Sequence, residues 1–482
     1  MTAAHTTDRQ SEDFTDMNRT PGKQAERRPK DLPIAKVWHF AIGQFGWAML
    51  SGLISNWLVY FYQPDRESIS QGQTVFVPQG LVLIGLFTVI GAITAFARFF
   101  DAFVDPAVAS LSDRCRSKAG RRIPFLRFAA LPLAAVTVLV FWSPINGTSW
   151  VNAAFLFLMV MGYYVALTFY CTPYNALIAE LGHDSKQQLT ISTAISFTWV
   201  AGTAIAYVAP VIWNLFLPAM GRVNAIRVTF TIIAAVAFVC MLVPTFSIRE
   251  RDYVDSHPTD ESALRSLAQT FRNGEFRKFV GSDIVYWVAV TMFQTGLPFF
   301  VTSLLGLPET TTTIYFVLMT VVSVCFYLPV NRLAGRLGKK RLMLIGFVIF
   351  TCSYAYAGLL GSPLIGVLPP MVQGLALAVV AAIPMAIFGI LPQAVVANIA
   401  GASAAETGEN REGMFYAART FAMKMGQSVS MLLFTGLATI GAASGSGTGY
   451  RLSAFCAAAL CGLGGIIFAF YDERKILRRL GE

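Results

Sequence analysis

The residues best suited to chemistry are three charged side chains inside one otherwise apolar segment, ARFFDAFVDP. Arg98, Asp101 and Asp105 stand at positions i, i+3 and i+7, which places them on one face of an α-helix. A charge at mid-bilayer costs about 2.5–3.5 kcal/mol on the insertion scale, so these residues should face the protein interior or a wet cavity. Two carboxylates on one face can bind a hard cation such as Na⁺, as metal ligands, or can carry H⁺. The alternative is that Arg98 simply neutralises one acid.

A fourth charge, Lys424, lies deep inside a second apolar segment, TFAMKMGQS. From that depth a lysine cannot easily extend its ammonium group to either membrane surface. It therefore needs an anionic partner, for which Asp101 and Asp105 are the natural candidates. If the apolar segment is shorter than we predict, Lys424 is instead an ordinary lysine at a helix end.

A third apolar segment, LTFYCTPYNAL, contains Pro173. A proline inside a helix removes a backbone hydrogen bond and kinks the helix, which frees carbonyl groups near Thr168 and Asn175. Taken alone, Pro173 is more simply explained as a residue that shapes the helix.

The composition requires lipid as the solvent for much of the chain. The 482 residues are 55% hydrophobic and 13% charged, whereas soluble domains contain about 25% charged residues. The net charge of +10 comes from basic residues in short loops, without a basic stripe among exposed aromatics, so nucleic acid is not an expected partner. The seven cysteines contain no CxxC pair, which indicates core residues and neither a metal site nor disulfides.

The apolar runs predict an all-α polytopic membrane protein with about 12 transmembrane helices, each of about 20 residues. The predicted spans are residues 36–62, 80–109, 125–143, 150–178, 188–216, 226–246, 279–304, 313–331, 342–361, 365–397, 414–440 and 452–471. Lysine and arginine concentrate in the loops of one side, which predicts that both termini are cytoplasmic and that the chain lies in the plasma (inner) membrane.

The spans fall into two sets of six. We predict a disordered tail at 1–33, an N-terminal six-helix bundle at 34–246, a cytoplasmic central loop at 247–278, a C-terminal six-helix bundle at 279–471 and a cytoplasmic tail at 472–482. Each half has a basic loop between its second and third spans, SDRCRSKAGRRIP and NRLAGRLGKKR. This matched placement is typical of a transporter built from repeats. No catalytic constellation points to an enzyme, and no GxxxxGK[ST] motif points to an ATP-driven pump.

Three segments resemble the glycoside–pentoside–hexuronide:cation symporters, a branch of the major facilitator superfamily that includes melibiose permease. Residues 97–126, which begin ARFFDAFVDP, are similar to the second span of that family and the loop after it. Residues 169–181, FYCTPYNALIAEL, are similar to its fourth span, and residues 409–428 resemble its entry into the eleventh span. The resemblance implies the major facilitator fold, with two six-helix bundles around a central cavity and alternating access.

The resemblance also implies roles for individual residues. Asp101 and Asp105 would be cation ligands, and the hydroxyl of Thr168 would help the same site. Lys424 would tie the second bundle to that site, and Arg98 matches the arginine that precedes the acids. These two basic residues are the predicted coupling residues.

The solute site departs from that of melibiose permease. Trp47 and Ala48 stand where the permease has lysine and aspartate, Cys171 stands where it has aspartate, and residues 189–216 contain no charge to match its arginine. The remaining amides and aromatics favour a neutral solute held by hydrogen bonds and stacking. The predicted solute-binding residues, any of which could instead be a packing residue, are Gln44, Trp47, Asn56, Tyr170, Tyr174, Asn175 and Trp199.

We therefore predict a cation-coupled symporter, monomeric and surrounded by membrane lipid, that moves a small solute such as a sugar or glycoside. The expected coupling ion is Na⁺ or H⁺, with no further cofactor. Two alternatives stay open, namely a carrier of lysolipids or other amphiphiles with the same fold and a non-transporting membrane receptor.

Overall fold

The computed structural model describes residues 31–85, 87–117, 119–182, 185–254, 270–407, 412–442 and 444–480. Nearly all of the predicted N-terminal tail and residues 255–269 of the predicted central loop therefore lie outside the described residues.

Twelve long helices run through the described residues. Those of the first half are α1 (Ile34–Tyr62), α3 (Val89–Asp113), α4 (Ile123–Val140), α5 (Trp150–Leu181), α6 (Ser185–Met220) and α7 (Arg222–Ser247). Those of the second half are α10 (Gly274–Phe299), α11 (Thr310–Leu337), α12 (Lys339–Leu359), α13 (Pro370–Thr407), α14 (Glu412–Ala438) and α15 (Thr448–Ala469). The short helices are α2 (Arg66–Ser70), α8 (Glu250–Tyr253), the π-helix η1 (Phe300–Leu304), the 3₁₀-helix η2 (Pro363–Ile365) and α16 (Glu473–Leu480).

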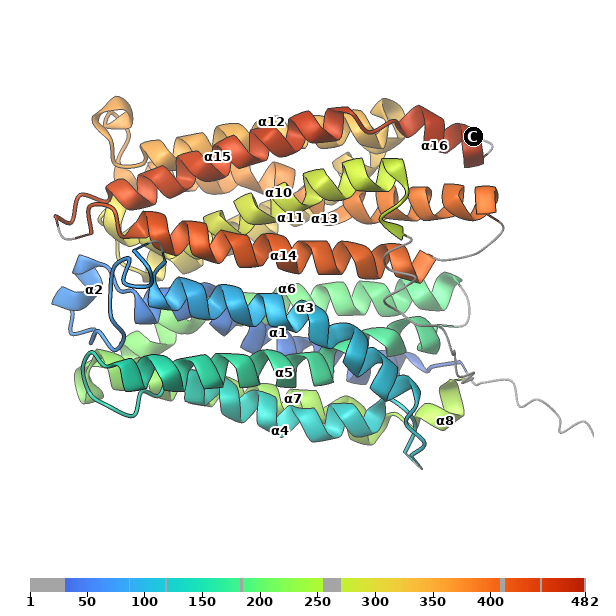
Figure 1. Ribbon diagram of the computed structural model, residues 1–482, viewed down its shortest axis with the longest axis horizontal. Helices are drawn as coiled ribbons and strands as arrows, with labels where there is room; N and C mark the ends of the chain where they lie inside the picture. The colour runs from blue at the N-terminus through green and yellow to red at the C-terminus, as the bar shows by residue number, and fades with distance from the viewer. Residues whose placement is uncertain are drawn as a thin grey trace, which may run out of the picture.

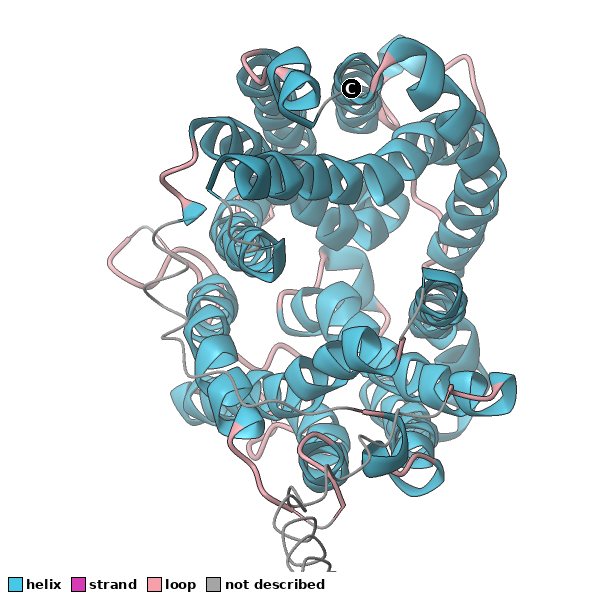
Figure 2. Ribbon diagram, turned by 90° about the vertical axis from the view of Figure 1, so that its right-hand side faces the viewer, coloured by secondary structure: helices cyan, strands magenta, loops and turns pink. Residues whose placement is uncertain are grey.

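The two halves of the chain lie side by side. Figure 1 shows α1 and α3–α7 in its lower part and α10–α15 in its upper part, and Figure 2, which looks along the helices, shows the same separation. One end of the molecule carries α8 and α16, and we call it the terminal face. The opposite end, which carries α2, is called the far face.

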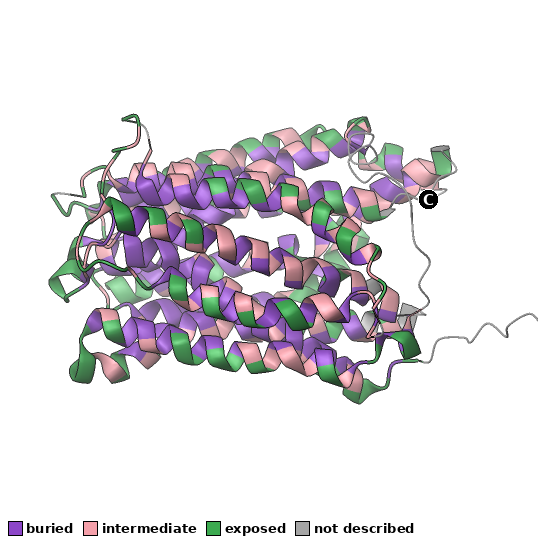
Figure 3. Ribbon diagram, turned by 60° about the horizontal axis from the view of Figure 1, so that its bottom comes forward, coloured by how far each residue is buried: buried purple, intermediate pink, exposed green. Residues whose placement is uncertain are grey.

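Much of the outer surface is apolar. Nine of the described helices are long and apolar enough to cross a membrane. The other long helices are α1, α3 and α14, and the last two carry Arg98, Asp101 and Lys424 inside the apolar run. Large apolar side chains such as Phe128 and Leu215 are about three-quarters exposed, at 73% and 75%. Figure 3 shows exposed positions spread along the peripheral helices. Such a surface is suited to contact with lipid.

The second long helix begins later than the apolar pattern indicates. We predicted a span over 80–109, but α3 starts only at Val89. The residues just before it form a short turn closed by an isolated β-bridge, in which Gly85 has φ +70°. Glycine adopts this backbone conformation without steric cost. The hydroxyl of Thr88 then caps the helix by accepting a hydrogen bond from the backbone N–H of Gly91 at 3.0 Å.

An acidic side chain caps the third long helix of each half. Glu250 accepts a hydrogen bond at 2.8 Å from the backbone N–H of Arg121, just before α4. Glu473 accepts one at 2.8 Å from the backbone N–H of Lys339, where α12 starts. Each acid follows the sixth long helix of its half, and the helix dipole favours a carboxylate at this end. The repeat that the two basic loops indicate thus recurs in the tertiary contacts.

Candidate cation and solute site

The predicted cation site is a cluster between α3 and α14. The ammonium Nζ of Lys424 lies 2.7 Å from Oδ2 of Asp101 and 2.6 Å from Oδ2 of Asp105. Asp101 is buried, with 3% of its surface exposed. One lysine of the second half therefore holds both carboxylates of the first half, as the burial cost of these charges requires.

Helix α5 supplies a hydroxyl to each carboxylate of the cluster. Thr168 donates a hydrogen bond to Oδ1 of Asp101, and Thr172 donates one to Oδ1 of Asp105 at 3.2 Å. The two threonines are four residues apart, and so are the two aspartates. Because an α-helix has about 3.6 residues per turn, each pair lies on one side of its helix and the two pairs can face each other. The cluster thus offers carboxylate and hydroxyl oxygens, which are the ligands that hard cations prefer.

Arg98 is held apart from the two acids. Its Nη1 donates to Oε1 of Gln427 at 2.6 Å, its Nη2 donates to the hydroxyl of Ser55 at 3.4 Å, and its guanidinium lies over the ring of Tyr164. Among the described residues, no ion pair joins Arg98 to either aspartate of the cluster. The alternative in which Arg98 neutralises one acid is therefore wrong for this conformation, because Lys424 takes both.

A polar face of α1 leads away from the cluster toward the predicted solute site. Gln44, Trp47, Ser51 and Ser55 recur every three or four residues and so share one side of the helix. Ser51 accepts a hydrogen bond from the hydroxyl of Tyr163 at 3.4 Å. This side of α1 therefore extends from Ser55, which contacts Arg98, to Ser51, which contacts α5.

Three of the predicted solute-binding residues on α1 have buried polar atoms without a protein partner. These atoms are Oε1 of Gln44, Nε1 of Trp47 and Nδ2 of Asn56. The ring of Trp47 also packs against Trp199 of α6, with centroids 4.9 Å apart. Unpaired buried donors and acceptors cost free energy unless water or a ligand satisfies them, so these atoms are available to a polar solute.

The two halves are joined by polar contacts from the cluster outward to the far face. Beyond the contact of Arg98 with Gln427, Ser428 of α14 donates to the backbone carbonyl of Ala95 at 2.6 Å. Near the far face, Gln63 donates to the carbonyl of Thr435 at 3.1 Å. Several more hydrogen bonds and ion pairs join the two halves at the cluster or between it and the far face.

A sequence profile described as "MFS/sugar transport protein" matches residues 39–455. The chain belongs to this family. The match extends from within α1 to within α15 and so includes most of both halves. It confirms the predicted family resemblance, the predicted major facilitator fold and the prediction of a membrane transporter of a small solute. Members of the MFS/sugar transport family are transporters and not enzymes.

Three relatives show how far the similarity extends. YicJ, an inner membrane symporter of Escherichia coli K12, is 27% identical over 227 residues, which are 46% of this chain and 47% of YicJ. The uncharacterized symporter YjmB of Bacillus subtilis 168 is 28% identical over 361 residues, or 73% of this chain and 75% of YjmB. The isoprimeverose transporter of Lactiplantibacillus pentosus is 21% identical over 321 residues, or 66% and 63% of the two chains. The chain thus spans about half of YicJ but three-quarters of YjmB.

Solved structures of other transporters share the fold at low sequence identity. A mutant of the nucleoside transporter NupG superposes with a TM-score of 0.65 over 91% of this chain and 100% of that chain, at 13% identity. A bacterial homolog of the lysosomal transporter Spinster, in an inward-facing and unoccupied conformation, superposes with a TM-score of 0.63 at 13% identity, over 92% of this chain and 97% of that chain. At this identity the similarity shows the fold alone.

Two members of the predicted solute site do not reach a solute in this conformation. Tyr170 and Tyr174 are fully buried, and their hydroxyls donate to the backbone carbonyls of Met241 and Phe40 at 2.9 and 2.6 Å. The ring of Tyr174 also stacks on that of Phe40, 4.3 Å between centroids. Both tyrosines therefore pack α5 against α1 and α7, and their placement in the solute pocket is wrong here.

The remaining two candidates are accessible. Asn175 is exposed and lies on the face of α5 that carries Thr168 and Thr172, further toward the terminal face. Trp199 is 40% exposed, on the side of α6 that meets Trp47.

Sequence reasoning missed several residues of the site. Gln427 and Thr172 contact Arg98 and Asp105, and Ser55 is the second partner of Arg98. The available signal was spacing, since Gln427 follows Lys424 by three residues and so shares its helix face.

Proposed function

We propose that this transporter couples the movement of a small neutral solute of the sugar type to that of a cation, Na⁺ or H⁺, by alternating access. The observation that carries the proposal is that Lys424 of the second half is bonded to both Asp101 and Asp105 of the first half. A cation that binds these carboxylates must compete with the ammonium group for the same oxygen atoms. Its binding therefore changes a contact between the two halves, which is what coupling requires.

The net charge of the cluster determines how much charge the loaded transporter moves across the membrane. Two aspartates and the two basic residues Arg98 and Lys424 balance one another. The loaded carrier then carries one positive charge if the solute is neutral. A membrane potential acts on such a step with about 2.3 kcal/mol per charge and 100 mV.

The solute is proposed to bind next to the cluster on the polar face of α1. On this face Gln44 and Trp47 offer unpaired polar atoms, and Trp47 with Trp199 offers an aromatic surface. Asn56 has an unpaired amide nitrogen as well, but it lies on another side of α1. Hydroxyl groups with an apolar ring face match this combination. These polar and aromatic groups favour such a solute over the amphiphile of a lipid carrier, and the contact between the two halves favours a transporter over a receptor.

The basic loops support an orientation in the plasma (inner) membrane with the terminal face on the cytoplasmic side. On this orientation the conformation is closed to the outside by its polar contacts. We also propose that the transporter is a monomer and binds no nucleic acid.

Uptake by proteoliposomes tests the proposed function. Radiolabelled sugars and glycosides should accumulate when an inward Na⁺ or H⁺ gradient is imposed, and a gradient of the other ion separates the two. The Asp101→Asn variant is the matched control, because it keeps the size of the side chain and removes the charge. Accumulation that is independent of both gradients would refute coupling.

A further inference from the structure

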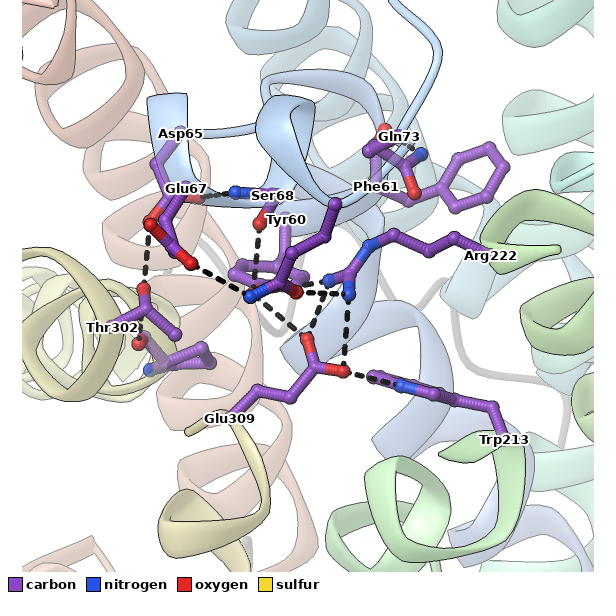
Figure 4. A network of polar contacts seen from close by, with 12 residues as sticks. Tyr60, Phe61, Asp65, Glu67, Ser68, Gln73, Trp213, Arg222, Thr302 and Glu309 are labelled. Carbon is purple, nitrogen blue, oxygen red and sulfur yellow. Dashed lines mark hydrogen bonds and ion pairs between the residues drawn. The ribbon is translucent and has the colours of Figure 1, made fainter. Parts of the chain in front are cut away.

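The carboxylate of Glu309, directly before α11 of the second half, is inserted among donors of the first half (Figure 4). Nε1 of Trp213 and Nη2 of Arg222 each lie 2.5 Å from one of its oxygens, and the hydroxyl of Tyr60 donates at 3.0 Å. Nη1 of Arg222 also donates to Gln71 at 2.7 Å. Glu309 and Arg222 are buried, with 6% and 4% of their surfaces exposed.

A second carboxylate makes the reverse contact on the same face. Asp65 of the first half, which caps α2, accepts hydrogen bonds from Thr302 at 2.7 Å and Ser303 at 2.6 Å. Both hydroxyls belong to η1, where the helix widens into a π-turn at the end of α10. Such turns are frequent at functional sites, and here the turn directs two consecutive hydroxyls to one oxygen. Each half thus places one buried acid into the other.

Ion pairs near the terminal face are arranged differently. Arg479 pairs with Glu406 at 2.6 Å, and Arg122 pairs with Glu180 at 2.9 Å, but each of these pairs lies inside one half. They can therefore stay intact when the halves move apart or together at that end. The contacts of Glu309 and Asp65 cannot, because any opening of the far face separates their partners.

We propose that Glu309 with Arg222, and Asp65 with Thr302 and Ser303, form a latch that holds the far face closed and sets the fraction of molecules open to that side. A buried ion pair is strong only while water is excluded, and removing one partner strands the other charge. The latch therefore favours the closed far face until the halves separate and water hydrates both charges. The proposal rests on the proposed function only in treating this opening as a step of transport.

Distances between the two halves test the latch without any transport assay. Spin labels are attached to cysteines introduced at Asn146 and Val367 on the far face, in a full-length protein whose seven native cysteines are replaced. A second pair at Arg114 and Arg336 reports on the terminal face. Electron–electron double resonance in lipid nanodiscs then measures the label distances, and from them the fractions of molecules with the far face open and closed. In Glu309→Gln we expect the ratio of far-face-open to far-face-closed molecules to rise about tenfold or more, with a matching decrease in distance at the terminal face.

A second variant guards against failure to fold. Arg222→Gln combined with Glu309→Gln removes both charges together and strands neither, so it should express while still opening the far face. Glu406→Gln is the matched control, since it removes an acid from an arginine pair inside one half and should leave both distance distributions unchanged. Unchanged far-face distances in both latch variants would overturn the proposal. A shift in distances in the latch variants, together with uptake by the wild-type protein that is independent of Na⁺ and H⁺ gradients, would keep the latch and refute the proposed function.

Discussion

Replacing Lys424 by methionine separates two roles that the lysine could have in the cluster. The ammonium group makes two charge-assisted contacts, at 2.7 and 2.6 Å. Such hydrogen bonds contribute about 1.5–3 kcal/mol each, and breaking a buried ion pair costs about 3–5 kcal/mol. If a cation must displace Lys424, this cost is subtracted from the binding free energy of the cation.

The expected result for Lys424→Met is therefore tighter cation binding together with lost transport. Each 1.4 kcal/mol corresponds to a tenfold change in affinity, so relief of the competition should strengthen Na⁺ binding by about a hundredfold or more. Concentrative uptake should fall to background because the contact between the halves no longer responds to the cation. Expression should change much less than transport.

Isothermal titration of Na⁺ into the purified protein, alongside solute uptake in vesicles, measures both effects. Lys475→Met is the matched control, because Lys475 is 49% exposed at the side chain and its pair with Glu275, at 3.8 Å, is a surface contact worth about 0–1 kcal/mol. Transport at the wild-type rate would remove Lys424 from the mechanism. Loss of cation binding would show instead that the lysine supports the site. If neither protein binds Na⁺, the same comparison is made from proton uptake.

Three further predictions follow from the same contacts. The double variant Asp101→Asn and Asp105→Asn should abolish accumulation against a gradient while solute exchange partly survives, and normal concentrative uptake would exclude these acids as cation ligands. Melibiose should bind weakly or not at all, because the charged residues that grip it in melibiose permease have no counterparts here, and tight Na⁺-dependent binding in a competition assay would contradict this. Gln427→Leu should lower the free energy of unfolding by about 1–3 kcal/mol, because it leaves a buried donor of Arg98 unpaired, and an unchanged thermal unfolding midpoint would argue against that contact.

Local chemistry was readable from the sequence. The shared face of Arg98, Asp101 and Asp105 follows from helix periodicity, which depends only on positions within one segment. The depth of Lys424 in an apolar run identified it as a residue that needs an anionic partner, and the structure supplies that partner. The family resemblance rests on the same local motifs, and the profile match confirms it.

Which partner a polar side chain chooses was decided by the tertiary structure. Arg98 faces Gln427 and not an aspartate of its own helix, because α14 crosses α3 at that level. Tyr170 and Tyr174 are packing residues because their side of α5 faces α1 and α7. The sequence does not show which side of α5 faces these helices. A sequence lists donors and acceptors, but it does not state the rotation of one helix against its neighbours.

The latch is the clearest case of this division. From the sequence, Arg222 is one of a few basic residues on the sparsely charged side, and it serves only to establish the orientation of the chain. Its acidic partner Glu309 stands 87 positions away in the other half. The two meet because the end of α6 and the start of α7 lie against the start of α11 at the far face. Burial between two packed halves turns an ordinary pair of loop charges into a strong contact, and only tertiary structure determines burial.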